Sequence, residues 1–257
     1  MSYDNIMILE LMPLLSKPST IELSGNGEHI AVVVWDGKKL KTVGPIIQRE
    51  TYLRFNGNVH IDGRVVLDIE GVNFGTADFA GLKRSIETGG PYWVEAGVRD
   101  IGDLFDVITL SPEMTMIGTM GLKGHEMMKE AIEISNSCIP LIYASNNEAV
   151  FHRFRLPLGE TIREMGDIGF ESCVVLDLES LGKKINRTFW SKLSHIIEIV
   201  PCGGILLTDV PFLSREGYST AIVEPSLPQE KSNSADWCID TACITESPRA
   251  KGRWVGI

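Results

Sequence analysis

The chain has 257 residues, of which 44% are hydrophobic and 23% charged, ordinary values for a globular protein. Its 24 basic and 34 acidic side chains give a formal net charge of −10. This balance argues against binding to nucleic acids or membrane surfaces, because both need a basic face, although a local basic pocket for a small anion stays compatible with it. No stretch is long and apolar enough for a membrane span. Five scattered cysteines predict a reduced, cytoplasmic protein, and neither Cys238 nor Cys243 has partners at zinc-site spacing.

The N-terminal residues carry Ile6, Leu9 and Met12 at helical spacing. This spacing predicts a short helix that docks on the body, within an extension covering residues 1–18. The stretch contains Asp4 and Glu10 and has no basic start, so we do not expect a signal peptide.

One unit then recurs along the chain: a short apolar run, a polar or glycine turn, and an amphipathic stretch. The apolar runs predict eight buried strands, at Thr20–Leu23, Arg64–Ile69, Tyr92–Glu95, Thr115–Gly118, Leu141–Ala144, Cys173–Leu178, Glu198–Cys202 and Thr220–Val223. The intervening stretches predict helices, at Ala77–Thr88, Ile101–Thr109, His125–Ser135, Glu160–Gly169, Arg187–Ile197 and Phe212–Gly217. Such alternation indicates parallel strands joined by crossover helices. Eight units in this length predict a single α/β domain with a (β/α)8 TIM barrel over residues 19–228, rather than an open doubly wound sheet.

Two places break the alternation. Asp36-Gly37 lies between two segments rich in β-branched residues, His29–Trp35 and Lys38–Val43, which is typical of a β-hairpin. We therefore expect a hairpin after strand one, with a first outer helix that is short or absent. Residues 229–257 are polar and predict a surface wrap or a partly disordered tail.

In such a barrel the chemistry lies at the carboxyl ends of the strands. The sequence places five acids there: Glu22, Asp68, Glu95, Asp177 and Glu179. Burying several acids together raises some of their pKa values, so we expect Glu22, Asp68 and Asp177 to act as catalytic acids or bases. The alternative is that individual acids cap helices or pair with nearby basic residues such as Arg99.

Glycines at the strand ends point to anion binding. The backbone and hydroxyl groups expected to bind phosphate belong to Gly97, Val98, Gly118, Thr119, Gly203 and Gly204. The alternative is that these glycines only permit tight turns. The side chains expected to contact the substrate are Glu95, Arg99, Asn146 and Glu179. No histidine ends a strand, but His152, with Arg153 and Arg155, is positioned to contact a substrate anion.

The order and spacing of several segments resemble the ribotide isomerase of histidine biosynthesis and, more closely, its archaeal and methylotroph relatives of uncertain function. These segments are Asp68–Gly71, Glu95–Asp103, Ile117–Thr119, Leu176–Leu178 and Cys202–Ile205. The resemblance runs from about Thr20 to Pro228. It implies a (β/α)8 barrel with two phosphate sites related by a half-barrel pseudo-twofold. It also implies an Amadori aldose–ketose isomerisation of a phosphoribosyl amine, with no metal or nicotinamide.

The departures from this family are informative. Its isomerases use an aspartate at the end of strand one and another at the end of strand five, where this chain has Glu22 and Asn146. Glu95 brings a negative charge toward one phosphate site. At the other, Glu224 would repel an anion, and Pro225 has no amide hydrogen to donate. We therefore expect the site at Gly118-Thr119 to be the better preserved one.

These departures argue against histidine biosynthesis itself and leave three hypotheses. The first is an isomerase-like acid–base enzyme acting on a phosphorylated small molecule, which the surviving acids favour. The second is a synthase or lyase of one-carbon cofactor biosynthesis (methanofuran or tetrahydromethanopterin), by analogy with the relatives. The third is a non-catalytic descendant that binds a ligand or a protein. We expect no metal and no cofactor, while a protein partner or a homo-oligomer stays open.

Overall fold

The structure is a computed structural model that describes residues 6–14, 29–48, 61–87, 92–193 and 195–224. The chain divides into two compact units, Met1–Leu227 and Pro228–Ile257, and all the described residues lie in the first. Several expectations lie outside the described residues: the strand at Thr20–Leu23, the residue Glu22, Pro225, and the tail at 229–257 with Cys238 and Cys243.

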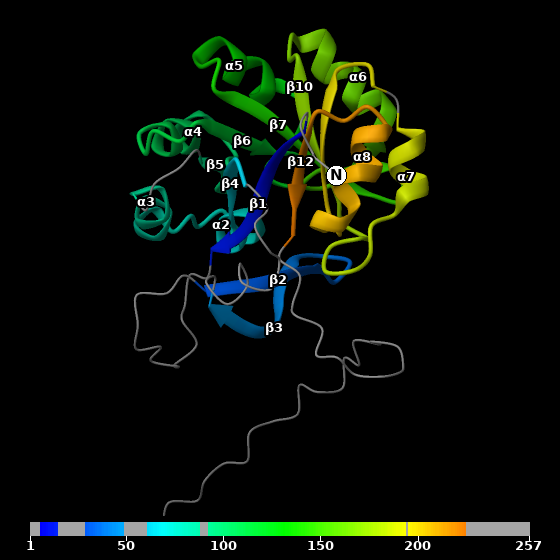
Figure 1. The fold of residues 1–257 in the computed structure, drawn as a ribbon. Helices are drawn as coiled ribbons and strands as arrows, with labels where there is room; N and C mark the ends of the chain where they lie inside the picture. The colour runs from blue at the N-terminus through cyan, green and yellow to red at the C-terminus, as the bar shows by residue number, and fades with distance from the viewer. Residues whose placement is uncertain (1–5, 15–28, 49–60, 88–91, 194, 225–257) are drawn as a thin grey trace, which may run out of the picture. The chain divides into compact units, whose positions relative to one another are not determined.

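Eight parallel strands close into a barrel (Figure 1). Their order around the barrel is β1 (Met7–Leu14), β4 (Gly63–Asp68), β5 (Tyr92–Glu95), β6 (Met114–Gly118), β7 (Cys138–Ser145), β10 (Ser172–Asp177), β11 (Glu198–Cys202) and β12 (Thr220–Val223). Parallel pairing of β12 with β1 and of β7 with β10 completes the ring. This arrangement confirms the predicted (β/α)8 fold.

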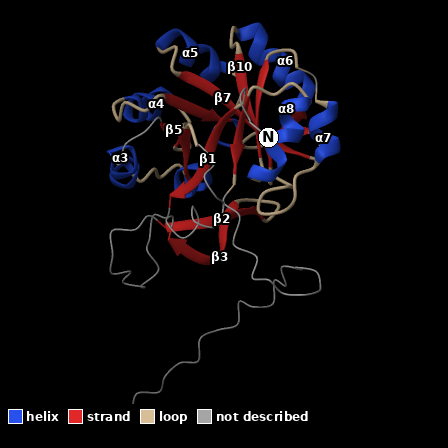
Figure 2. Ribbon diagram, viewed as in Figure 1, coloured by secondary structure: helices blue, strands red, loops and turns tan. Residues whose placement is uncertain are grey.

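Helices cover the outside of the barrel (Figure 2). They are α2 (Ile69–Phe74), α3 (Phe79–Glu87), α4 (Ile101–Ile108), α5 (Glu126–Ile134), α6 (Leu158–Ile168), α7 (Arg187–Lys192) and α8 (Val210–Arg215), with short 3-10 turns η1 (Thr119–Gly121) and η2 (Leu207–Asp209). The predicted helices are found close to their expected bounds, except that α7 ends before Ile197. The sequence pattern missed α2, which begins directly after β4.

The strands bury both faces, as the continuous apolar runs predicted. Leu9 and Leu11 of β1 belong to a cluster inside the barrel. Ile8, which precedes Leu9 and faces the other side of the strand, belongs to a second cluster that fills the layer between the strands and the helices. The two clusters explain why an outward-facing strand position is as apolar as an inward-facing one.

The predicted N-terminal helical extension is wrong, because Met7–Leu14 forms the first barrel strand. This strand pairs with β12 and β4 and is buried on both faces. Glu10 interrupts its apolar run although its side chain is fully buried, so the remaining apolar residues mimic helical spacing. Since strand one is Met7–Leu14, the argument that put Glu22 at the end of strand one fails, and the barrel begins well before residue 19.

The predicted hairpin is confirmed as β2 (His29–Trp35) and β3 (Leu40–Gln48), paired antiparallel. Asp36 fixes the turn, since its Oδ1 accepts from the backbone N–H of Lys38 and of Lys39, both at 2.9 Å. Val33 and Leu40 of the hairpin are buried in the same cluster as the barrel interior. The Asn73 side chain accepts from Leu40 N at 3.0 Å and donates to Leu40 O at 2.9 Å, which fastens the hairpin to α2.

A second hairpin extends β7 through β8 (Glu148–Val150) into β9 (Arg155–Pro157). Asn146 and Asn147 make its two-residue turn with φ of 54° and 63°. Two consecutive left-handed residues match the type I′ hairpin turn, which favours asparagine and glycine. The left-handed backbone of this turn therefore accounts for an asparagine at position 146.

The two halves of the barrel carry an internal repeat. Val65–Gly71 reads VVLDIEG at the end of β4, and Val174–Ser180 reads VVLDLES at the end of β10. The two strands are the second and the sixth of the eight in sequence, so they are four strands apart. Residues of one half thus have counterparts in the other, Asp68 with Asp177 and Gly71 with Ser180.

Candidate functional site at the carboxyl mouth of the barrel

Four acidic side chains lie at the carboxyl ends of the strands and are almost completely buried. They are Asp68, Glu95, Asp177 and Glu224, exposed by 0%, 1%, 4% and 5%. Three of them, Asp68, Glu95 and Asp177, are acids expected at this rim. A buried carboxyl group is costly unless it is hydrogen-bonded or neutral, so the partners of each acid decide what it can do.

Asp68 holds the backbone that follows β4. Its Oδ1 accepts from Gly71 N at 3.0 Å, which caps α2, and its Oδ2 accepts from Asp78 N at 2.6 Å. Burial raises the pKa of Asp68, while these amides lower it. Because each oxygen already holds a backbone amide, the geometry gives Asp68 a structural role, and its catalytic role stays a prediction.

Asp177 holds the equivalent turn after β10. Its Oδ1 accepts from Glu179 N at 3.2 Å, and its Oδ2 accepts from the Ser180 hydroxyl at 2.5 Å. Burial raises its pKa, and the Ser180 hydrogen bond lowers it. The catalytic role predicted for Asp177 is likewise untested, and its oxygens are likewise engaged.

Glu95 points into the barrel. Its Oε1 accepts from Gly97 N at 3.1 Å. Its Oε2 is buried and has no hydrogen-bond partner of good geometry among the described residues, and the same is true of the Tyr143 hydroxyl. Burial raises the pKa of Glu95 to about 8, the Gly97 amide opposes this, and the charge of Asp68 adds to it. Glu95 is therefore mostly protonated at neutral pH.

Gly118 marks how tightly this carboxyl is enclosed. A Cβ at Gly118 would lie 2.6 Å from the Tyr143 ring and 2.7 Å from Glu95 Oε1. The Gly118 amide also lowers the pKa of Glu95. The glycine is thus required by the carboxyl group that lies against it.

Glu224 follows β12 and has two backbone donors. Its Oε1 accepts from Gly204 N at 2.6 Å, and its Oε2 accepts from Gly182 N at 2.9 Å. Burial raises the pKa of Glu224 to about 7, whereas the two amides lower it. The sequence prediction named Gly204 as a phosphate donor, but in the structure its N–H already binds a carboxylate of the chain.

The remaining residues predicted to bind phosphate are built into the core. Val98 is 1% exposed and Thr119 is fully buried. The Thr119 hydroxyl oxygen accepts from Tyr143 N at 3.2 Å. At Gly203, where φ is 109°, a Cβ would lie 2.4 Å from Asp177 O. These positions thus serve close backbone packing.

Two residues predicted to contact substrate meet at the end of β7. The buried Ser145 hydroxyl donates to Glu179 Oε1 at 2.7 Å. Ser145 Oγ in turn accepts from Asn146 Nδ2 and from Arg155 Nη1, each at 3.3 Å. Asn146 and Glu179 thus belong to one polar cluster at the rim, next to an arginine.

A cavity of about 270 Å³ opens at this rim beside the hairpin. Its lining comes from the hairpin turn and from the segments that follow β4, β5, β6 and β7: Trp35, Gly37, Lys38, Lys39, Val72, Asn73, Arg99, Met120, Val150, Phe151, His152 and Arg155. Among the described residues, this lining includes four permanent cations and no carboxylate. In a chain of net charge −10, such a lining is selective for an anion.

Arg99 is the predicted substrate residue that reaches this cavity. Its Nη2 donates to Val72 O at 3.4 Å, and its Nε is buried without a hydrogen-bond partner in the described part of the chain. Its guanidinium packs over the turn that ends α2, because a Cβ at Gly75 would lie 2.7 Å from Arg99 Cζ. Arg99 therefore keeps donors available for a bound anion.

Sequence reasoning named Arg99, His152 and Arg155 near an anion but missed the hairpin cations. Lys38 and Lys39 directly follow Asp36-Gly37, so the sequence did predict that they lie in the turn of a hairpin. Their place above the barrel follows from the packing of Val33 and Leu40 on the interior cluster, a long-range contact that the local pattern does not contain.

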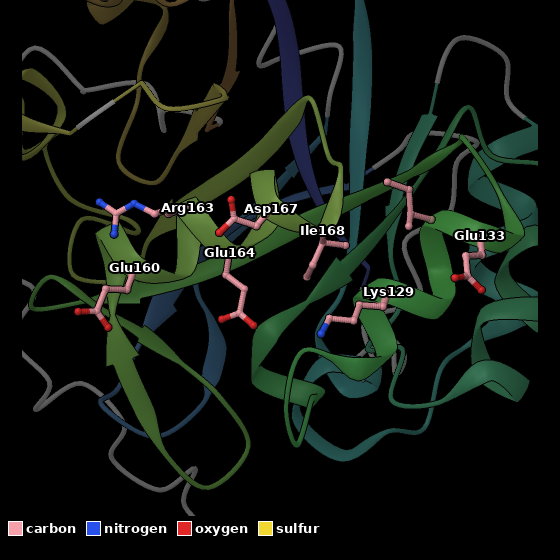
Figure 3. A pocket seen from close by; sticks show the side chains of 8 residues that line it. Lys129, Glu133, Glu160, Arg163, Glu164, Asp167 and Ile168 are labelled. Atoms are coloured by element: carbon pink, nitrogen blue, oxygen red, sulfur yellow. The ribbon is translucent and has the colours of Figure 1, made fainter.

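A larger groove of about 720 Å³ lies outside the barrel, between α5 and α6. Figure 3 shows Lys129 and Glu133 on one side of it, with Glu160, Arg163, Glu164 and Asp167 on the other. Its positive and negative side chains neutralise one another in part, and the lining residues belong to α5 and α6.

Several findings concern other classes of function. No helix in the described ranges is long and apolar enough to cross a bilayer. Within the same residues, no group of three or more His, Cys, Asp or Glu side chains is placed to hold a metal ion. Cys138, Cys173 and Cys202 are buried free thiols, whereas Cys238 and Cys243 lie outside the described residues.

The fold and rim define a (β/α)8-barrel protein whose strand ends carry buried carboxyl groups beside a cationic cavity. Comparison with known protein families finds no model that matches this chain, and no curated protein matches it either.

Proposed function

We propose that this barrel binds a phosphorylated small molecule in the cationic cavity at its carboxyl mouth. The observation that carries the proposal is the cavity lining, in which Lys38, Lys39, Arg99 and Arg155 gather without a carboxylate among the described residues. Arginine suits this task because its planar fork of donors matches phosphate oxygens. A cavity of about 270 Å³ admits a small metabolite and not a macromolecule.

The experiment is calorimetric titration with ribose 5-phosphate as the probe and ribose as the matched compound without phosphate. We expect the natural chain to bind the phosphorylated sugar only. Arg155→Ala and Lys38→Ala should each weaken binding about tenfold, the usual cost of losing one charged hydrogen bond. Arg163→Ala, on the exposed face of α6, is the matched control and should leave affinity unchanged.

Equal affinity in the Arg155→Ala/Lys38→Ala double variant and in the control would overturn the proposal. So would the absence of any binding by the natural chain at millimolar phosphorylated sugar. Circular dichroism of each variant checks that it is folded.

Within this proposal, the non-catalytic alternative has the most support from the geometry. Four of the described rim acids, Asp68, Glu95, Asp177 and Glu224, are buried, and most of their oxygens hold amides or hydroxyls of the chain itself, whereas Glu179 is exposed. An isomerase-like, synthase or lyase reaction needs a group that exchanges a proton with the ligand. Glu22 lies outside the described residues and has lost its predicted place at the end of strand one, so its catalytic role stays a prediction. Glu22→Gln tests that role alone: loss of turnover in a folded variant would favour an enzyme, and unchanged turnover would remove Glu22 from the reaction.

The kinship with the ribotide isomerases of histidine biosynthesis is part of the same proposal. It is supported by the repeat of Val65–Gly71 at Val174–Ser180, which the half-barrel symmetry of that family would produce. Kinship with this family does not identify the substrate, because proteins that share the barrel fold have many different activities.

A further inference from the structure

Arg155, one of the four cations that line the cavity, is held by other side chains of the rim. It begins β9, and the antiparallel pairing of β7 with β8 and of β8 with β9 brings it back beside the end of β7. Its Nη1 donates to Ser145 Oγ at 3.3 Å and lies 3.7 Å from Glu148 Oε2. Within the described ranges its Nε and Nη2 have no hydrogen-bond partner, so one side of the guanidinium is anchored and the other keeps its donors.

The Ser145 hydroxyl accepts from Arg155 because it gives its own hydrogen to Glu179. Ser145 Oγ donates to Glu179 Oε1 at 2.7 Å. A carboxylate only accepts and a guanidinium only donates, so the hydroxyl between them can point in one direction only. Asn146 Nδ2 donates to the same Oγ at 3.3 Å. The hydroxyl hydrogen and both oxygen lone pairs are therefore all in use.

The two side chains that contact Arg155 Nη1 differ in burial. Ser145 is 2% exposed and ends β7, a strand that is buried along its whole length. The Glu148 side chain is 49% exposed, and ion pairs between side chains as exposed as this contribute little. A long side chain loses rotamer freedom when it binds a ligand, and a contact that already restricts the side chain reduces that cost. Ser145 is therefore the contact that can fix the guanidinium before a ligand binds.

We propose that Ser145 and Glu179 position Arg155 so that its Nε and Nη2 donate together to two oxygens of the ligand's anionic group. The inference rests on the proposed function, because it needs a ligand in the cationic cavity. Ser145 and Glu179 are positioning residues, which act through Arg155 and do not contact the ligand. The cavity then selects an anion that carries at least two oxygens on one atom over a monatomic anion such as chloride.

Glu179→Ala gives the sharpest test, because positioning and simple charge predict opposite results. Removing a negative charge close to a bound anion should tighten binding if Glu179 acts by its charge alone. If Glu179 instead orients the Ser145 hydroxyl, calorimetric titration with ribose 5-phosphate should show binding about threefold weaker than in the natural chain. Glu148→Ala is the matched control: it removes the same charge from the same guanidinium, leaves the Ser145 hydrogen bonds in place, and should not weaken binding.

Ser145→Ala tests whether the hydroxyl acts through Arg155. We expect it to weaken binding of ribose 5-phosphate about fivefold in the natural chain. In the Arg155→Ala background the same substitution should change nothing further, because residues that act through one contact are not additive. A general loss of structure at the rim would instead weaken binding equally in both backgrounds.

Arg155→Lys tests the two-donor geometry. Lysine keeps the positive charge but has no planar pair of donors. We therefore expect Arg155→Lys to lose about as much affinity as Arg155→Ala. Chloride at equal ionic strength should compete with ribose 5-phosphate less well than inorganic phosphate does in the natural chain, and equally weakly in Arg155→Lys.

The failure of this inference can be told from the failure of the proposed function. If the natural chain does not bind ribose 5-phosphate at all, both are overturned. If Arg155→Ala weakens binding but Ser145→Ala and Glu179→Ala do not, only the positioning role is overturned. Circular dichroism checks that each variant is folded, and if Ser145→Ala is not, Glu179→Ala at its exposed position decides alone.

Discussion

Glu95→Gln is expected to remove a large pH dependence from the stability of this barrel. Burial raises the pKa of Glu95 from 4.5 to about 8, so between these values the folded state binds a proton that the unfolded state has lost. Stability therefore falls as pH rises through this window and levels off above pH 8. Glutamine stays neutral at every pH, so the variant lacks this loss.

The size of the effect follows from the two pKa values. A tenfold change in proton affinity is worth about 1.4 kcal/mol, and the pKa of Glu95 rises from 4.5 to about 8, so the loss approaches ~5 kcal/mol. Native domains are stable by roughly 5–15 kcal/mol. The ionisation of this one side chain thus removes a considerable part of the total, and Glu95→Gln becomes the more stable protein at pH 9.

Urea unfolding followed by circular dichroism, at pH values from 5 to 9, measures this difference. Titration of other groups, including Glu224, affects both proteins and cancels in the comparison. Glu113→Gln, an exposed residue just before β6, is the matched control and should run parallel to the natural chain. If Glu95→Gln also runs parallel to the natural chain, the assignment of Glu95 as a buried neutral acid is refuted.

Three further substitutions test the packing of the rim. Gly71→Ala should cost about 3 kcal/mol, because its Cβ would lie 2.2 Å from Ala96 O; urea unfolding compares it with Gly159→Ala, where nothing lies within 4 Å. Asp68→Ala should cost about 2 kcal/mol through the lost cap of α2, and Asp68→Asn less, so equal urea midpoints for the two variants would contradict the capping role. Asn147→Gly should stabilise by up to ~1 kcal/mol because φ is 63° there, and a lower thermal midpoint would contradict the type I′ turn.

Most of the strands could be predicted because a parallel barrel buries both faces of each strand, which leaves uninterrupted apolar runs. The run at Cys173–Leu178 and the strand β10, Ser172–Asp177, differ by one residue at each end. The hairpin at Asp36-Gly37 could be predicted equally well, since its turn depends on two adjacent residues. Elements whose structure is determined by their own residues could therefore be predicted from the local sequence.

The first strand was missed for the opposite reason. Glu10 is fully buried within Met7–Leu14, and a charged residue inside a strand breaks the apolar run by which strands are recognised. Only the pairing of this segment with β12 and β4, from distant parts of the chain, gives it a sheet partner on each side. A local pattern cannot contain that information, and the wrong strand one then carried Glu22 into the predicted site.

The site was predicted in its location and not in its contacts. Asp68, Glu95 and Asp177 lie at the rim as expected, yet their oxygens engage Gly71, Gly97 and Ser180. Spacing along the sequence shows which residues end a strand. It does not show whether a carboxyl group turns toward the opening or back onto its own loop.

These contacts separate two layers at the mouth of the barrel. In the lower layer, buried carboxyl groups bind the loops that follow the strands, as Asp68 and Glu224 do. In the upper layer, Lys38, Arg99 and Arg155 line an open cavity. The hairpin lies over the barrel interior, since Val33 is buried in the same cluster as the inward-facing strand residues. Removing a carboxyl group should therefore change stability first, whereas removing a cation should change ligand binding with little effect on folding.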